Sequence, residues 1–145
     1  MIKVLCVGKI KEAYLNELIN DYLKRISRYH KIEIIELKDD VNYQKEVTNI
    51  SSKIDSKDYN IALDLKGKKL TSEDFAKNID KLFIYNGTIT FIIGGSNGLN
   101  DEIRNKCNEI ISFSDLTFPH GLFRGILLEQ IYRAFKIINN ETYHK

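Results

Sequence analysis

A glycine-rich segment, Gly94-Gly95-Ser96-Asn97-Gly98, is the first feature of the sequence that could bind a ligand. It directly follows an apolar, β-branched run that ends at Ile93. Glycine lets the backbone approach a ligand closely and adopt positive φ, and free amides at a helix start bind anionic or hydrogen-bond-accepting groups. The segment is neither a dinucleotide fingerprint, which follows the first strand, nor a P-loop, which needs a Lys-Ser/Thr pair. It indicates either a cofactor loop or a tight strand-to-helix turn without a ligand.

A second candidate, Ser112 to Gly121, mixes hydroxyl and aromatic residues around the only proline of the chain, Pro119. Such a loop can surround an adenine ring with apolar atoms and offer main-chain groups to its edge. The alternative is a loop that only leads into the last helix, in which Pro119 sets the backbone and His120 hydrogen-bonds locally.

The C-terminal segment is the third candidate. Tyr143, His144 and Lys145 combine a stacking ring, a titratable imidazole and a cation, which together suit a nucleotide. Chain ends are commonly disordered, so a solvated tail is the alternative.

Strand-like and helix-like patterns alternate along the chain and must position these segments. Strands are predicted at Lys3–Val7, Ile32–Leu37, Asn60–Leu65, Thr88–Ile93 and Ile110–Phe113. Helices are predicted at Glu12–Tyr29, Val41–Ile54, from Thr71 (in a capping box with Asp74) to Phe83, at Asp101–Cys107 and at Leu122–Ile138. Parallel neighbours need a crossover long enough to hold a helix, so the fold class is α/β, a parallel sheet with helices on both faces. Ligands of such sheets lie at the carboxyl ends of the strands, here the loops after Leu65, Ile93 and Phe113.

Length and composition limit the classes of protein to consider. The 145 residues fit a single domain, residues 1–145, and 43% hydrophobic with 29% charged residues is typical of a globular chain. No apolar run is long enough for a membrane span or a signal peptide, so a cytoplasmic protein is expected. Two cysteines and three scattered histidines indicate neither a disulfide framework nor a metal site.

The last predicted helix is apolar on more than one face, with Ile131 near its centre. A helix of this kind must be covered on two sides. The second cover comes either from another subunit, which predicts a homodimer, or from a central position within one chain.

Four ordered motifs resemble the large-subunit ribosomal RNA pseudouridine N3-methyltransferases of the SPOUT class. They are Ile92–Gly98, Ser112–His120, Leu128–Lys136 and Tyr143–Lys145, and Val7-Gly8-Lys9 and Tyr22-Leu23-Lys24-Arg25 also match. The resemblance covers the whole chain. It implies a SPOUT-type domain with a C-terminal trefoil knot, a homodimer that binds S-adenosylmethionine, and methylation of N3 of a pseudouridine in 23S ribosomal RNA within the ribosome.

The resemblance also assigns the cofactor site residue by residue. The implied cofactor-binding residues are Leu63, Gly94, Phe113, Ser114, Asp115, Leu116, Thr117 and Phe118. Two departures stand out: Asp115 replaces a residue that is often basic, and the segment from Lys38 to Asn60 is shorter than usual.

Methyl transfer from a sulfonium depends mainly on orientation, but an imide nitrogen must also lose its proton. Arg133 is a candidate to hold a phosphate or a developing oxyanion, and His144 to orient or deprotonate the base. The alternative role of both residues is RNA binding. The tail acts either within one chain or across a dimer. Water is the alternative proton acceptor. Phosphate contacts are expected from the basic N-terminal residues Lys9, Lys11, Lys24, Arg25 and Arg28. The rival function is a non-enzymatic nucleotide- or RNA-binding module.

Overall fold

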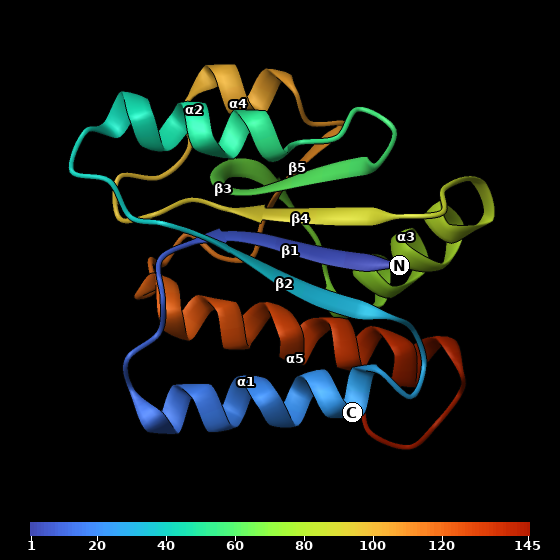
Figure 1. Ribbon diagram of the computed structural model, residues 1–145. Coiled ribbons are helices and arrows are strands. Elements are labelled where there is room, and N and C mark those ends of the chain that lie inside the picture. Colours follow the sequence, from blue (N-terminus) through green and yellow to red (C-terminus); the bar gives the residue numbers. More distant parts are fainter.

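Five parallel strands form one sheet in the order β2-β1-β4-β3-β5 in the computed structural model, which describes residues 1–145 (Figure 1). The strands are β1 (Ile2–Val7), β2 (Ile32–Leu37), β3 (Tyr59–Lys69), β4 (Ile89–Ile93) and β5 (Glu109–Ser112). The predicted α/β class and all five strands are confirmed. No helix of the structure combines the length and the apolarity needed to cross a membrane.

The five predicted helices are also present. They are α1 (Ala13–Ile26), α2 (Tyr43–Lys53), α3 (Ser72–Tyr85), α4 (Asp101–Asn105) and α5 (His120–Ile138). Side-chain caps explain where three of them begin. Asn42 accepts from the amide of Lys45, Thr71 from that of Asp74, and Asn100 from that of Ile103. The predicted cap at Thr71 is therefore confirmed.

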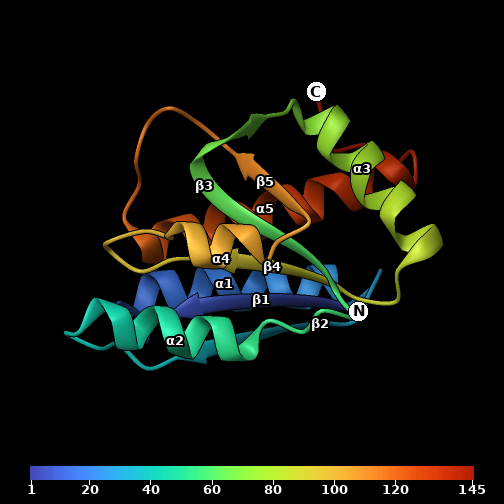
Figure 2. The same cartoon turned by 90° about the horizontal axis from the view of Figure 1, so that it is seen from above.

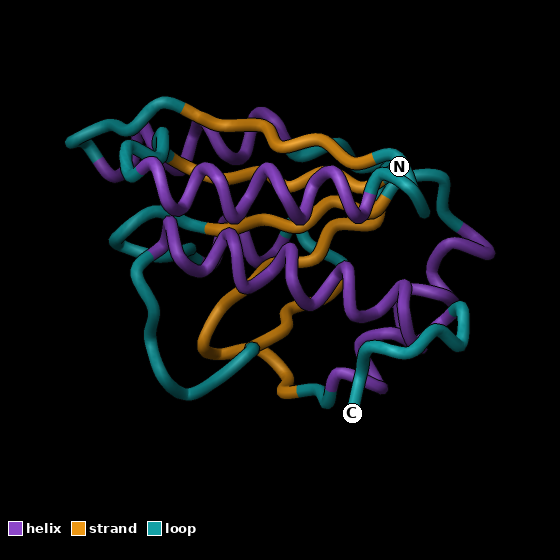
Figure 3. The backbone as a smooth tube through the Cα atoms, turned by 90° about the horizontal axis from the view of Figure 1, so that it is seen from below, coloured by secondary structure: helices purple, strands orange, loops and turns teal.

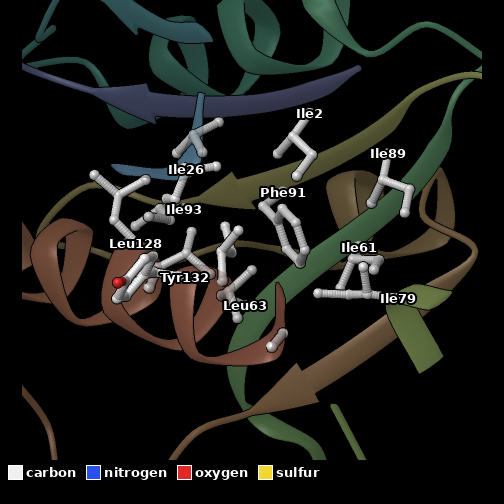
Figure 4. Close-up of a cluster of buried hydrophobic side chains, with 14 of the residues drawn as sticks. Ile2, Ile26, Ile61, Leu63, Ile79, Ile89, Phe91, Ile93, Leu128 and Tyr132 are labelled. Carbon is white, nitrogen blue, oxygen red and sulfur yellow. The ribbon is translucent and has the colours of Figure 1, made fainter. Parts of the chain in front are cut away.

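Helices cover both faces of the sheet because successive strand residues point to opposite sides. Val4 and Cys6 of β1 face the layer of α1, α3 and α5, whereas Leu5 and Val7 face α2 and α4. Figure 4 shows the larger cluster, centred on the fully buried Phe91. The two layers hold the sheet rigid and leave its carboxyl edge free for loops.

Helix α5 packs against α1 on one side and α3 on the other. Leu127, Leu128 and Ile131 have no exposed surface within this single chain. The central position thus accounts for most of the apolar circumference of α5, and the homodimer prediction cannot rest on Ile131.

Strand β3 continues past the predicted end at Leu65 to Lys69, which corrects that boundary. It pairs with β5 in two registers, with a shift between Leu63 and Lys68, so the strand bends around its neighbour (Figures 2 and 3). At the bend, a Cβ on Gly67 would lie 2.5 Å from the carbonyl carbon of Ile111. Only glycine allows this approach of two backbones, a tertiary constraint that the local pattern of lysines does not reveal.

Candidate functional site

A cavity of about 400 Å³ opens at the carboxyl ends of β3, β4 and β5, the edge predicted from the sequence. Three loops form its walls: the bend after Leu63, the glycine segment from Gly94 to Leu99, and the loop from Ser112 to Phe118. His120 and Phe123 of α5 close it. Its volume lies in the range of small-molecule sites, roughly 300–1,000 Å³.

Seven of the eight predicted cofactor-binding residues line this cavity. They are Leu63, Gly94, Phe113, Ser114, Leu116, Thr117 and Phe118. Asp115 does not line it: its side chain is 76% exposed and forms an ion pair with Lys69 of β3. An exposed carboxylate pairs with the nearest cation, so this side chain points away from the cavity while its neighbours line the wall.

The glycine segment folds back on itself between β4 and α4. Gly95 and Gly98 form an isolated antiparallel bridge, and Gly98 has a φ of 72°. A Cβ on Gly94 would lie 2.7 Å from the carbonyl carbon of Gly98, so no side chain fits at this position. Tyr43 of α2 donates its hydroxyl to the Gly98 carbonyl at 3.2 Å. These contacts fix the loop at the cavity wall.

Hydroxyl groups shape the loop from Ser112 to Phe118. Ser112 donates to the carbonyl of Ser114 at 3.1 Å, and the Ser114 hydroxyl accepts from the amide of Leu116 at 2.9 Å. The rings of Phe113 and Phe118 both pack on Phe123 of α5. The loop therefore presents aromatic surface and ordered main chain together.

Arg133 and His144, the predicted catalytic residues, lie together but away from this cavity. Arg133 is thirteen residues beyond His120 along α5, about 20 Å at 1.5 Å per residue. Figure 1 shows the tail at the end of α5 opposite the carboxyl ends of the strands. Within one chain, the structure thus separates the predicted cofactor residues from the predicted catalytic pair.

The side chains of Glu73, Glu129, Arg133, Tyr143 and His144 form a hydrogen-bonded group, the tail network. The Glu129 carboxylate at its centre fixes Arg133 and Tyr143. Glu129 accepts from Nη2 of Arg133 at 2.6 Å and from the Tyr143 hydroxyl at 3.1 Å. The Arg133 guanidinium also lies over the Tyr143 ring, 4.8 Å from its centroid. Burial and the nearby Glu129 raise the pKa of Tyr143 to about 12, so its hydroxyl stays protonated and donating at neutral pH. The tail is held by side-chain contacts and does not form the solvated end that was the alternative.

Both ring nitrogens of His144 have partners. Nδ1 lies 3.0 Å from Nη1 of Arg133, and Nε2 lies 2.7 Å from a carboxylate oxygen of Glu73 on α3. A guanidinium can only donate, so Nδ1 must accept and Nε2 must carry the proton, a tautomer assigned from these partners. The hydrogen bond from His144 lowers the pKa of Glu73. The Nδ1 lone pair of His144 is therefore occupied by Arg133.

The chain is similar to known methyltransferases over almost its whole length. The family described as "Predicted SPOUT methyltransferase" matches residues 1–144. The chain belongs to the SPOUT methyltransferase family. It is 48% identical to the ribosomal RNA large subunit methyltransferase H 1 of Clostridium perfringens, and the match covers 99% of each chain. The ribosomal RNA large subunit methyltransferases H of Caldicellulosiruptor saccharolyticus and Streptococcus uberis are each 47% identical, over 100% and 99% of both chains respectively.

A solved structure has a similar fold. The probable methylase family protein from Haemophilus influenzae superposes with a TM-score of 0.57 at 15% identity, covering 99% of this chain and 70% of the other. At this identity the likeness concerns the fold alone.

In this SPOUT chain, a buried carboxylate that the sequence analysis did not single out lies against the glycine loop. Glu46 of α2 is 7% exposed, and a Cβ on Gly95 would lie 3.0 Å from its Oε1. Its Oε2 has no hydrogen-bond partner. Burial, followed by the charges of Asp39 and Asp40, raises the pKa of Glu46. Glycine at position 95 is what lets the loop lie on this carboxylate.

A charged pair on the cavity wall was also missed. Arg104 of α4 donates to Asp64 at 2.9 Å and to the Leu99 carbonyl at 2.6 Å, and each of the two charged side chains is only 12% exposed. Asp64 directly follows Leu63 in β3, so its place at a carboxyl end was the available signal. The pair ties the glycine segment to β3.

The two cysteines lie in surroundings that disfavour the thiolate. Burial raises the pKa values of Cys6 and Cys107 to about 11, so both thiols are protonated at neutral pH and are poor nucleophiles. No three His, Cys, Asp or Glu side chains are grouped so as to hold a metal ion.

Proposed function

We propose that this SPOUT methyltransferase transfers the methyl group of S-adenosylmethionine to N3 of a pseudouridine in 23S ribosomal RNA, within the assembled ribosome. The observation that carries the proposal is the cavity in which three separate loops bring seven predicted cofactor residues together. The three named relatives, each similar over its full length, are called ribosomal RNA large subunit methyltransferases. Because the proposed substrate is ribosomal, the proposed location is the cytoplasm.

The cavity residues fit S-adenosylmethionine. Leu116, Phe118 and Phe123 supply apolar surface for an adenine ring, and the ordered main chain around Ser114 supplies groups for its edge. On the opposite wall, Gly94 lets the segment turn back onto Gly98, so that main-chain atoms lie there. The cofactor, when bound, supplies a methyl group activated on a sulfonium. The protein contributes orientation and exclusion of water.

We assign the proton and charge chemistry to the tail network. The Glu129 carboxylate holds the Arg133 guanidinium, which suits a phosphate or the negative charge that develops on the ring oxygens of the substrate. His144 can accept a proton at Nδ1 only after Arg133 turns from it to the substrate. The two residues therefore change partners together. The tail therefore acts either across a dimer, on the cavity of the partner subunit, or within its own chain from the side of α3 and α5.

An exposed apolar patch supports the proposed homodimer. It comprises Tyr14 and Leu18 of α1 and Leu122 of α5, which are 37–70% exposed. Leu18 lies against Gly125 of α5, so the two helices are in contact at this point. Large exposed apolar side chains on neighbouring helices mark an interaction surface.

The path of the C-terminal half supports the proposed trefoil knot. Strand β4 lies between β1 and β3, the chain then crosses to the outer side of β3 to form β5, and β3 bends around β5 at Gly67 (Figure 2). Threading of the last segment through this bend would produce a knot, which connection rules otherwise disfavour.

Exposed basic residues supply the proposed RNA contacts. Lys9, Lys11, Lys24 and Arg28 are exposed, and Arg25 is 45% exposed beside Asp21. Such residues contribute affinity for phosphates without selecting a sequence.

Calorimetric titration separates the proposed function from its rival, a nucleotide- or RNA-binding module without chemistry. We expect micromolar binding of S-adenosylmethionine. Preference for a nicotinamide or flavin nucleotide would contradict the assignment of the cavity.

A further inference from the structure

A second, smaller cavity of about 170 Å³ lies beside the first, between the start of α3, the end of β5 and the middle of α5. Ser112, Phe113 and Phe118 line both cavities. At this size it lies below the range of complete small-molecule sites and suits a single planar ring. Its apolar walls include Phe75 and Phe113, whose rings meet edge to face.

The polar groups of this cavity are fixed in one orientation. Ser72 donates its hydroxyl to Oε1 of Gln130 at 2.8 Å, and Nε2 of Gln130 donates to Glu129 at 3.0 Å. A flipped amide would place its oxygen against the Glu129 carboxylate, which is repulsive. The carboxylate therefore fixes the Gln130 oxygen toward Ser72. That oxygen has a second lone pair and can accept one more hydrogen bond.

A ligand for this cavity is thus a planar heteroaromatic ring with an N–H group. We propose that the smaller cavity holds the target base and that Gln130 Oε1 accepts the N1–H of pseudouridine, an assignment that rests on the proposed function. Pseudouridine is joined to its sugar through carbon, so its N1 carries a proton, whereas N1 of uridine carries the sugar. N1–H is therefore the group by which an enzyme tells the two bases apart. Recognition through N1 leaves N3 free for reaction at the boundary with the first cavity.

Two polar residues that line the smaller cavity are sequence neighbours of residues in the tail network. Ser72 precedes Glu73, the partner of His144, and Gln130 follows Glu129, the partner of Arg133. The base-binding groups and the proposed acid–base groups thus share two short segments, on α3 and α5.

The test compares ribosomes that carry either pseudouridine or uridine at the target position, in single-turnover methyl transfer with saturating S-adenosylmethionine. Gln130→Met keeps the length of the side chain but removes the strong acceptor. We expect transfer to pseudouridine to fall about 10- to 100-fold, with transfer to uridine and the affinity for S-adenosylmethionine unchanged. Ser72→Ala, which loosens the amide without removing it, should give a smaller loss, again confined to pseudouridine. Gln44→Met, on the exposed face of α2, is the matched control and should match the parent.

The outcomes separate this inference from the proposed function. If the parent enzyme methylates both ribosomes equally, or if Gln130→Met lowers both rates by the same factor, the recognition role of Gln130 is wrong and the methyltransferase assignment stands. If the parent protein methylates neither, the proposed function itself fails.

Discussion

Gly94 illustrates how a single position controls the candidate cofactor site. Its missing side chain lets the segment after β4 turn back onto Gly98 at a distance that no Cβ tolerates. The turn places main-chain atoms of the segment on the cavity wall. Glycine is needed at position 94 because the backbone there lies closer to Gly98 than a Cβ atom allows.

We expect Gly94→Ala to open this turn and to lower the affinity for S-adenosylmethionine about 10-fold or more, because relieving the clash costs ~1–3 kcal/mol. Calorimetric titration gives the affinity, and circular dichroism checks that the variant is folded. Gly87→Ala is the matched control, since a Cβ there meets no atom within 4 Å. Parent-like affinity in a folded Gly94→Ala protein would remove the segment from the site.

Most of the cofactor-binding residues that the family resemblance implies lie on one cavity, whereas the partners of individual side chains were not predictable. Seven predicted residues line the cavity, but Asp115 forms an ion pair with Lys69, a residue 46 positions away. The roles of Glu46 and Gln130 were not predictable either, because each depends on contacts between distant segments. Local spacing carries no information about such contacts.

We expect the C-terminal tail to contribute to methyl transfer but not to the binding of S-adenosylmethionine. Removing residues 143–145 should leave the affinity for S-adenosylmethionine within a few-fold of the parent, because none of them lines the larger cavity. Methyl transfer at saturating ribosomes should fall ~10²–10⁴-fold, the usual contribution of positioned acid–base groups. His144→Ala should reproduce much of this loss, and Thr142→Ala, an exposed neighbour, should not. A loss of only a few-fold on truncation would make the tail an RNA-affinity element.

Attachment of the tail should depend on pH. The hydrogen bond from His144 lowers the pKa of Glu73, and hydrogen bonds from Lys136 and Tyr29 lower that of Glu141. A carboxylate with a lowered pKa stabilises the docked state fully above its ordinary pKa, here 4.5, and this stabilisation is lost as the pH falls through the lowered value. We therefore expect these two carboxylate contacts to hold the tail at neutral pH and to be lost below about pH 4.5.

Amide hydrogen exchange of residues 141–145 as a function of pH measures this release. Glu73→Gln retains an acceptor but cannot titrate, so the remaining pH dependence should follow Glu141 alone. Release well above pH 5, unaffected by this substitution, would show that neither carboxylate holds the tail.

Element boundaries were predictable where a cap or a periodic pattern defines them. Asn42 and Thr71 begin α2 and α3 within two residues of the predicted starts. The carboxyl end of β3 was predicted at Leu65 instead of Lys69, because the extension depends on pairing with β5 across the bend at Gly67. The strand order β2-β1-β4-β3-β5 likewise depends on tertiary packing, which the alternation of strands and helices leaves open.

The proposed dimer depends on the exposed apolar residues of α1 and α5, which are Tyr14, Leu18 and Leu122. Leu122→Glu places a charge on this surface and should weaken association ~10²-fold or more while leaving the monomer folded. Light scattering with circular dichroism checks both properties. Ile131→Asp should instead unfold the chain, since Ile131 is fully buried within one subunit. A Leu122→Glu protein that stays dimeric would place the interface elsewhere.

The most direct test of the central proposal is incubation of the purified protein with S-adenosylmethionine and ribosomes that lack the modification, followed by nucleoside mass spectrometry of the 23S ribosomal RNA. We predict one added methyl group per ribosome, carried as N3-methylpseudouridine, and less product with Gly94→Ala at limiting cofactor. A folded protein that binds S-adenosylmethionine but adds no methyl group to this RNA, or adds it to another base, would contradict the account.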